Sequence, residues 1–102
     1  MGLDYILEDE DHRPIREVGD PRGYLSELLD RASVEALPLL SGVDRYGDTT
    51  FNRLQMRQVI VEWSLLMKWS ATSAQHQLIE RIIDLCNECE SEVHTYIRIE
   101  GD

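Results

Sequence analysis

Two cysteines and a histidine near the C-terminal end of the sequence have a spacing that could bind a metal ion. Cys86 and Cys89 form a C-x-x-C motif, and His94 follows them. Structural zinc takes four ligands, usually from two such pairs, and this sequence contains a single pair. We therefore expect no metal and no cofactor, with both cysteines packed as small apolar side chains. A metal- or ligand-binding domain around these three residues is kept as an alternative.

Redox chemistry at the cysteine pair is disfavoured by its position in a predicted helix. A reactive C-x-x-C motif lies at the N-terminus of a helix, where the helix dipole stabilises the thiolate. Cys86 and Cys89 fall near the end of a predicted helix, where the dipole opposes a thiolate. The neighbouring Glu88 and Glu90 oppose it further.

Catalytic motifs are not found in this sequence. It contains no G-x-S-x-G nucleophile elbow and no glycine-rich phosphate loop. Histidines and acids are present, but a catalytic triad is recognised by geometry and not by composition. We expect a non-enzymatic protein, with a small enzyme of unseen mechanism as a further alternative.

Acidic residues gather in two clusters that are the main candidates for a binding surface. Acids at the C-terminal end of a helix oppose the helix dipole, and a feature that costs stability is a hint of use. If the terminal strands pair antiparallel, both clusters converge at one end of a sheet. The first cluster is Glu8, Asp9, Glu10 and Asp11, and the second is Glu88, Glu90 and Glu92, with Glu100 and Asp102 further on.

A second candidate surface is the outward row of the last predicted strand. His94, Tyr96 and Arg98 alternate with apolar residues and so share one side of that strand. Tyrosine and arginine are enriched at binding hot spots, whereas an exposed sheet face is the ordinary alternative.

The overall charge limits the class of partner. Twenty acids against ten bases give a net charge of −10. Nucleic acid and anionic membranes require a basic surface, so we expect neither as a partner. A basic protein is the natural complement, although acidity could also serve only solubility.

The first elements that the sequence predicts, from the N-terminus, are two strands and a helix. Leu3–Leu7 alternates as a strand does, and Ile15–Val18 could be a second, short strand. Asp20 and Pro21 give a helix-start signal, with Pro38 ending that helical region. A core-facing stripe of Leu25, Leu28, Leu29 and Ala32 supports the helix. The segment 39–50 is expected to be a loop.

Two further helices and a strand follow. Asn52 and Gln55 form a capping box that opens a helix to about Trp69, and Thr72 and Gln75 open another that ends by Ser91. The first of these is apolar around most of its circumference, so we expect it to be buried on several sides, with Trp63 and Trp69 in the core. Val93–Ile99 alternates again and predicts a strand.

Together these patterns predict an α+β fold. Three helices pack on a small antiparallel sheet that includes the N- and C-terminal strands, in a single domain spanning residues 1–102. Arginine supplies nine of the ten bases, which hints at a GC-rich bacterial genome, and Gly2 and Asp4 after Met1 do not resemble a signal peptide. We expect a cytoplasmic protein. Exposed sheet edges would permit dimers, and the sequence leaves the oligomeric state open.

The size and charge of the chain resemble those of a broad class of proteins, and no motif identifies a single family. In both respects the chain is similar to small acidic bacterial inhibitors, immunity proteins and nucleic-acid mimics, which are non-enzymatic and act by binding. We therefore expect a small acidic binding protein that presents an acidic face to a basic protein partner. The residues expected to make contact are Glu8, Asp9, Glu10, Asp11, Glu88, Glu90, Glu92, His94, Tyr96 and Arg98.

Overall fold

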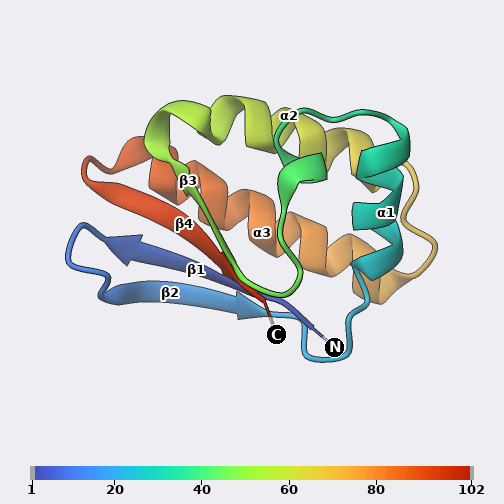
Figure 1. Ribbon diagram of the computed structural model, residues 1–102, viewed down its shortest axis with the longest axis horizontal. Coiled ribbons are helices and arrows are strands. Elements are labelled where there is room, and N and C mark those ends of the chain that lie inside the picture. Colours follow the sequence, from blue (N-terminus) through green and yellow to red (C-terminus); the bar gives the residue numbers. More distant parts are fainter. Residues whose placement is uncertain (1, 102) are drawn as a thin grey trace.

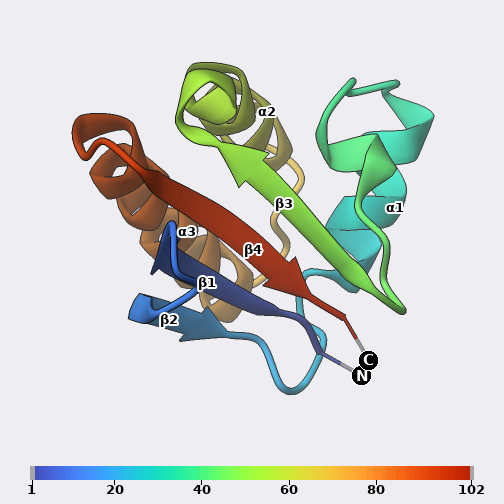
Figure 2. The ribbon, with the colours of Figure 1, turned by 60° about the vertical axis from the view of Figure 1, so that its left-hand side comes forward.

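A computed structural model describes residues 2–101, which form a four-stranded antiparallel sheet with three α-helices packed on it (Figure 1). The strands lie in the order β2-β1-β4-β3, so the strands nearest the two termini pair at the centre of the sheet. Figure 2 shows the helices gathered on one side of the sheet. The predicted α+β class is confirmed. The strands are β1 (Asp4–Asp9), β2 (Pro14–Gly19), β3 (Asp48–Asn52) and β4 (Thr95–Glu100), and the helices are α1 (Ser26–Val34), α2 (Met56–Met67) and α3 (Ser73–Ser91).

The core forms because the central strands alternate apolar and polar residues. Tyr5 and Leu7 of β1 and Ile97 and Ile99 of β4 point to the helical side and are almost fully buried. Helix α3 packs across this side and contacts β1, β2 and β4, while α2 lies against α3 and α1. The ring of Tyr5 meets that of Trp63 from α2 edge-on, with centroids 5.9 Å apart.

The hairpin between β1 and β2 confirms both predicted N-terminal strands, including the short one. Val18 is the residue of β2 that enters the core, whereas Ile15 is half exposed. Asp9 organises the turn, because its Oδ1 accepts hydrogen bonds from the backbone amides of Asp11 and Arg13. His12 in the turn has a φ of 63°.

The prediction that the first helix begins at Asp20–Pro21 is wrong. Helix α1 begins at Ser26, and the buried Asp20 accepts hydrogen bonds from the amides of Tyr24 and Leu25 across an irregular turn. Gly23 has a φ of 66°, which a helix does not contain, and so delays the helix. The predicted core stripe is nevertheless buried once the helix has formed.

The expected loop over 39–50 contains two elements that the sequence did not predict. A short 3-10 turn, η1, spans Leu40–Gly42, and Asp48–Asn52 forms the edge strand β3 beside β4. The strand is polar, and Phe51 is the one buried residue among 48–52. A strand paired on one side only can be short and polar, which is why its signal was weak.

The predicted capping box at the start of this helix is confirmed, although α2 itself begins at Met56. The Asn52 side chain accepts from the amide of Gln55 and the Gln55 side chain accepts from the amide of Asn52, which is the expected capping box. It caps a 3-10 turn, η2 (Arg53–Gln55), that leads into α2.

The prediction that this helix is buried on several sides, with Trp69 in the core, is wrong. Helix α2 ends at Met67, and Trp69 beyond it is 47% exposed, whereas Trp63 is buried as expected. Neighbouring elements cover only the side formed by Met56, Val59, Trp63 and Leu66. Val61 and Leu65 lie on the opposite, solvent-facing side.

Glu62 is the exception on the buried side of α2, because it is a fully buried carboxylate. Its Oε1 accepts hydrogen bonds from the amides of Leu39 and Leu40 at 3.1 and 2.8 Å, at the start of η1. Gln58 donates to its Oε2 at 2.9 Å. The carboxylate thus attaches the segment after α1 to the middle of α2.

Helix α3 and strand β4 follow the predicted pattern. The Thr72 side chain caps α3 by accepting from the amide of Gln75. Thr95, Ile97 and Ile99 are buried, but Val93, expected to share their side, lies before the strand and is 65% exposed. No helix within residues 2–101 is both long enough and apolar enough to cross a membrane.

Candidate functional site

One face of the sheet is not covered by a helix of the described chain, and we refer to it as the open face (Figure 2). Side chains alternate across a strand, so the residues between the core positions point to this face. The strand pairing arranges them in three rows. The rows are Asp4, Glu100 and Asp48; then Glu17, Ile6, Arg98 and Thr50; then Glu8, Tyr96 and Asn52.

The first row places three carboxylates side by side. Asp4 of β1 is directly opposite Glu100 of β4, and Glu100 is directly opposite Asp48 of β3. Side chains at opposite positions have Cβ atoms roughly 4.5–5.5 Å apart, and like charges there are destabilising. We call these three residues the carboxylate row. Two of the three, Glu100 and Asp48, also face the guanidinium of Arg98.

Arg98 lies at the centre of the open face and binds carboxylates on three sides. Its Nε donates to Oε1 of Glu8 at 2.9 Å, and its Nη1 is 2.5 Å from Oε2 of Glu100 and 3.5 Å from Oδ2 of Asp48. The hydrogen bonds to Glu100 and then Glu8 raise the pKa of Arg98 above its usual value. One arginine among so many acids leaves the open face with a net negative charge.

The expectation that Glu8 contacts a partner is not compatible with its position. Its side chain is only 1% exposed, although it points to the open face. Arg98 binds its Oε1, and Nδ1 of His12 is 3.5 Å from its Oε2, which has no hydrogen-bond partner among the described residues. Glu8 therefore positions Arg98 and is not itself accessible.

The two acidic clusters lie at the same end of the sheet, because β1 and β4 are antiparallel and Asp9 is opposite Thr95. Oε2 of Glu10 is 3.6 Å from Nδ1 of the exposed His94. The amide of Arg13, followed by that of Asp11, holds the pKa of Asp9 below its usual value by hydrogen bonding. The carboxylate of Asp9 is therefore used within the turn.

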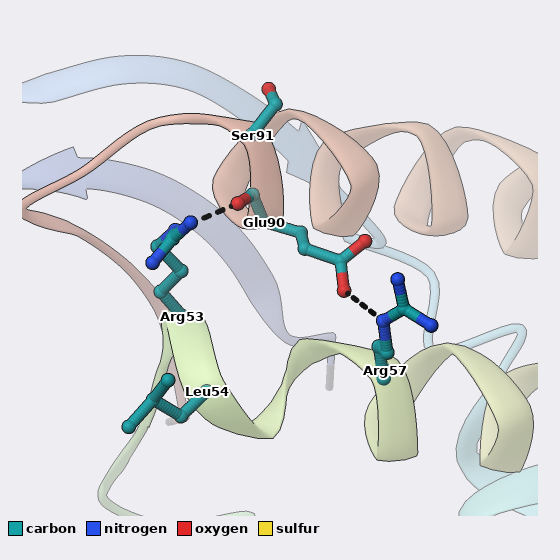
Figure 3. Close-up of a pocket in the computed structure, with 5 residues that line it drawn as sticks. All are labelled: Arg53, Leu54, Arg57, Glu90 and Ser91. Carbon is teal, nitrogen blue, oxygen red and sulfur yellow. Dashed lines mark hydrogen bonds and ion pairs between the residues drawn. The ribbon is translucent and has the colours of Figure 1, made fainter.

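Much of the second cluster is neutralised by arginines. Glu88 pairs with Arg16 at 2.9 Å, and Glu90 pairs with Arg57 at 3.0 Å. Figure 3 shows Arg53 and Arg57 on either side of Glu90, with Arg53 Nε donating to the backbone carbonyl of Glu90 at 2.8 Å. The sequence did not reveal the ion pairs of Glu88 and Glu90, because Arg16 lies in β2 and Arg57 in α2, far from these acids along the chain.

The remaining predicted contact residues are distributed unevenly. Asp11 and Glu92 are exposed, and Tyr96 is half-buried on the open face. His94 has a φ of 60° and lies before β4, so it does not share the row of Tyr96 and Arg98 as expected. Asp102 lies outside the described residues. The carboxylate row was missed because it requires the register of β3, which the sequence did not reveal.

The cysteine pair is not brought together with His94. Both thiols are free and buried on the core side of α3, whereas the side chain of His94 is 70% exposed. Burial raises the pKa of the Cys86 thiol to about 12 and also raises that of Cys89. Within residues 2–101, no three His, Cys, Asp or Glu side chains are grouped so that they could hold a metal ion.

Comparison with known proteins gives no relative from which a role could be transferred: no family model, no curated protein and no solved structure matches the chain.

Proposed function

We propose that this chain is a non-enzymatic binding protein whose acidic open face contacts a basic protein partner. The observation that carries the proposal is the carboxylate row, in which Asp4, Glu100 and Asp48 are direct cross-strand neighbours. Like charges at such positions reduce stability, and a basic partner would relieve that repulsion on binding.

The surroundings of the row support a protein partner. Tyr96 and Arg98 lie on the same face, and both residue types are common at binding hot spots. Glu8 and Glu100 fix the guanidinium of Arg98, so little side-chain entropy would be lost on binding. Arg98 is shared by Glu8, Glu100 and Asp48, whereas in the second acidic cluster Glu88 and Glu90 each pair with an arginine of their own, so that cluster is a poorer candidate.

The experiment is a capture of basic proteins from cells that make this protein, washed at low and then at high salt. The test variant is Asp4→Asn/Asp48→Asn/Glu100→Gln, which keeps side-chain size and removes the charge of the row. A matched control removes three exposed charges from the helices, as Glu27→Gln/Glu80→Gln/Asp84→Asn.

We expect the wild type and the helix control to capture the same basic protein, and the row variant to lose it. High salt should release it, because exposed charges are screened. A basic protein retained equally by the row variant, or no basic protein captured by the wild type, would contradict the proposal. A third variant, Glu10→Gln/Asp11→Asn/Glu92→Gln, tests the acidic end of the sheet separately.

A further inference from the structure

A separate surface, apolar and flanked by basic side chains, lies on the outer side of α2, in contrast to the acidic open face. Leu54, Val61, Leu65 and Trp69 are 86%, 51%, 40% and 47% exposed. Val61 and Leu65 lie one turn apart on α2, Leu54 lies in η2 before this helix, and Trp69 lies in the turn after it. We refer to these four residues as the α2 stripe. The helix between its two ends has 12 residues and is about 18 Å long at a rise of about 1.5 Å per residue.

Each end of the α2 stripe borders a depression. Near Trp69 lies a groove of about 340 Å³, whose lining residues are Glu35, Leu37, Leu65, Leu66, Lys68 and Trp69. Arg31 stacks on the ring of Trp69 at 3.6 Å and holds it in place. Such a groove can accept an apolar side chain from a partner.

At the other end, Leu54 borders a depression of about 440 Å³ that Arg53 and Arg57 also line (Figure 3). Glu90 binds both arginines through Nε, and within residues 2–101 no other hydrogen bond of either side chain is formed. Their Nη groups are therefore available to an acidic group.

The charge around the stripe is opposite to that of the whole chain. Between Thr49 and Ile79 the only acid is Glu62, which is fully buried. The exposed charges on this side of η2 and α2 are Arg53, Arg57 and Lys68. Charges further than a Debye length, about 8 Å at physiological salt, are largely screened. The field at the stripe is therefore set by these three bases and Arg31 against two acids, Glu35 beside Trp69 and Glu90 beside Arg53 and Arg57, so bases predominate.

We infer that the α2 stripe is the docking site for an acidic amphipathic helix of a partner protein. Apolar residues of that helix would contact Val61 and Leu65 and fill the groove beside Trp69. Its acids would pair with Arg53 and Arg57 at one end and with Lys68 at the other. About twelve residues of helix match the length of α2. This inference goes beyond the proposed function, because it involves another surface and a partner of opposite charge.

A second copy of the chain fits the stripe less well than an acidic helix does. Packing two α2 helices antiparallel would bring the bases of both copies together along the same seam. The net charge of −10 also opposes association of identical chains. Charge complementarity therefore favours a different, acidic partner.

The test is selection from a phage-displayed library of amphipathic peptides about 18 residues long, with fixed apolar positions at helical spacing and randomised flanking positions. Affinities of the selected peptides are then measured by fluorescence polarisation. The stripe variant is Val61→Glu/Leu65→Glu, and a second variant, Arg57→Glu/Lys68→Glu, reverses only exposed charges. Gln77→Glu/Asn87→Glu on α3 is the control with the same number of added acids, and circular dichroism verifies folding of each variant.

We expect selected peptides to carry acids at the flanking positions and to lose at least about tenfold in affinity with both α2 variants but not with the control. Enrichment of basic or uncharged flanks, or of no peptide at all, would overturn the inference. So would equal binding to the stripe variant. Dimers of the wild type that the stripe variant abolishes in sedimentation would identify a second copy as the occupant and would likewise overturn it.

Discussion

At the scale of single residues, Glu62 shows how one buried charge can organise a segment far from it in sequence. Its carboxylate accepts from the amides of Leu39 and Leu40, which would otherwise lack partners at the start of η1. A buried amide without a partner costs about 1–3 kcal/mol.

We therefore expect Glu62→Ala to lower the free energy of unfolding by roughly 3 kcal/mol, because it removes the acceptor of two amides. Gln58→Ala is the control, since Gln58 only donates to Glu62 from a solvent-facing position, and it should cost less than about 1 kcal/mol. Urea denaturation measures both, and hydrogen exchange should accelerate at Leu39 and Leu40. A loss for Glu62→Ala no larger than the control's would mean that water replaces the carboxylate.

The buried thiol of Cys86 should make the folded protein less stable as the pH becomes alkaline. Burial raises the pKa of its thiol from 9.0 to about 12, so the folded state retains a proton that the unfolded state releases. The stabilisation is complete below the unfolded pKa and is lost as the pH rises toward the folded one. The slope between those values is about 1.4 kcal/mol per pH unit for a single group.

Urea unfolding of the wild type and of Cys86→Ala, measured from about pH 8 to about pH 11, isolates this contribution. The variant should be less stable at neutral pH because it leaves a small cavity, but its stability should decline less steeply above the thiol's ordinary pKa. Tyr5, whose pKa is also raised by burial, gives both proteins a common remaining slope. Parallel curves for the two proteins would contradict the assignment to Cys86.

At the scale of elements, the end of α1 contains a residue in an unfavourable conformation. The amide of Leu37 donates to the carbonyl of Ala32 and that of Ala36 to Ser33, which is the Schellman pattern of helix termination. Ala36 has a φ of 54°, at the position where glycine is usual. A left-handed conformation costs an L-residue about 1–2 kcal/mol.

Ala36→Gly should therefore raise the free energy of unfolding by about 0.5–1 kcal/mol, after allowance for the greater entropy of glycine in the unfolded chain. Ser33→Gly, at an exposed helical position of the same element, should lower it by a similar amount. Thermal denaturation of the two variants side by side provides the measurement. A decrease in both would show that the positive φ of Ala36 carries no strain.

Elements with strong periodicity were predictable from the sequence, and an edge element was not. Strand β4 has an alternation that matches its burial, and the apolar repeats of helix α3 and strand β1 identify their core-facing residues, although the outward Ile6 and Glu8 of β1 are also buried. Strand β3 has a single well-buried residue, Phe51, and its last residue is also the cap of the next turn. The carboxylate row depends on the pairing of Asp48 with Glu100, so it could not be predicted without that strand.

The exposed side of α2 was unpredictable for a different reason. An apolar helix with Val61, Leu65 and Trp69 beside the core residues is typical of burial on all sides. The sequence shows which residues of a helix are apolar, but it does not show how many neighbouring elements are available to cover them. Among residues 2–101, α1 and α3 cover only one side of α2, and the α2 stripe remains in solvent.

At the scale of the whole molecule, charge is separated by surface. The open face and both sheet ends carry most of the exposed acids, whereas the outer side of α2 carries bases and apolar side chains. Paired arginines neutralise part of the acidic surface, but the net charge of −10 remains. Mutual repulsion of like charges destabilises a folded chain.

Stability should consequently rise with salt. Increasing the ionic strength from about 0.01 M to about 0.15 M shortens the Debye length from about 30 Å to about 8 Å and screens the repulsion. We expect the urea midpoint of the wild type to increase over this range.

Asp4→Asn/Asp48→Asn should be more stable than the wild type at low salt, by several tenths of a kcal/mol for each removed contact, and should gain less from salt. Glu27→Gln/Asp84→Asn removes the same charge from the helices, so a smaller effect there would place the repulsion in the carboxylate row. If salt instead lowers the midpoint, the ion pairs of Arg16, Arg57 and Arg98 outweigh the repulsion, and the row cannot be the costly feature on which the proposed function depends.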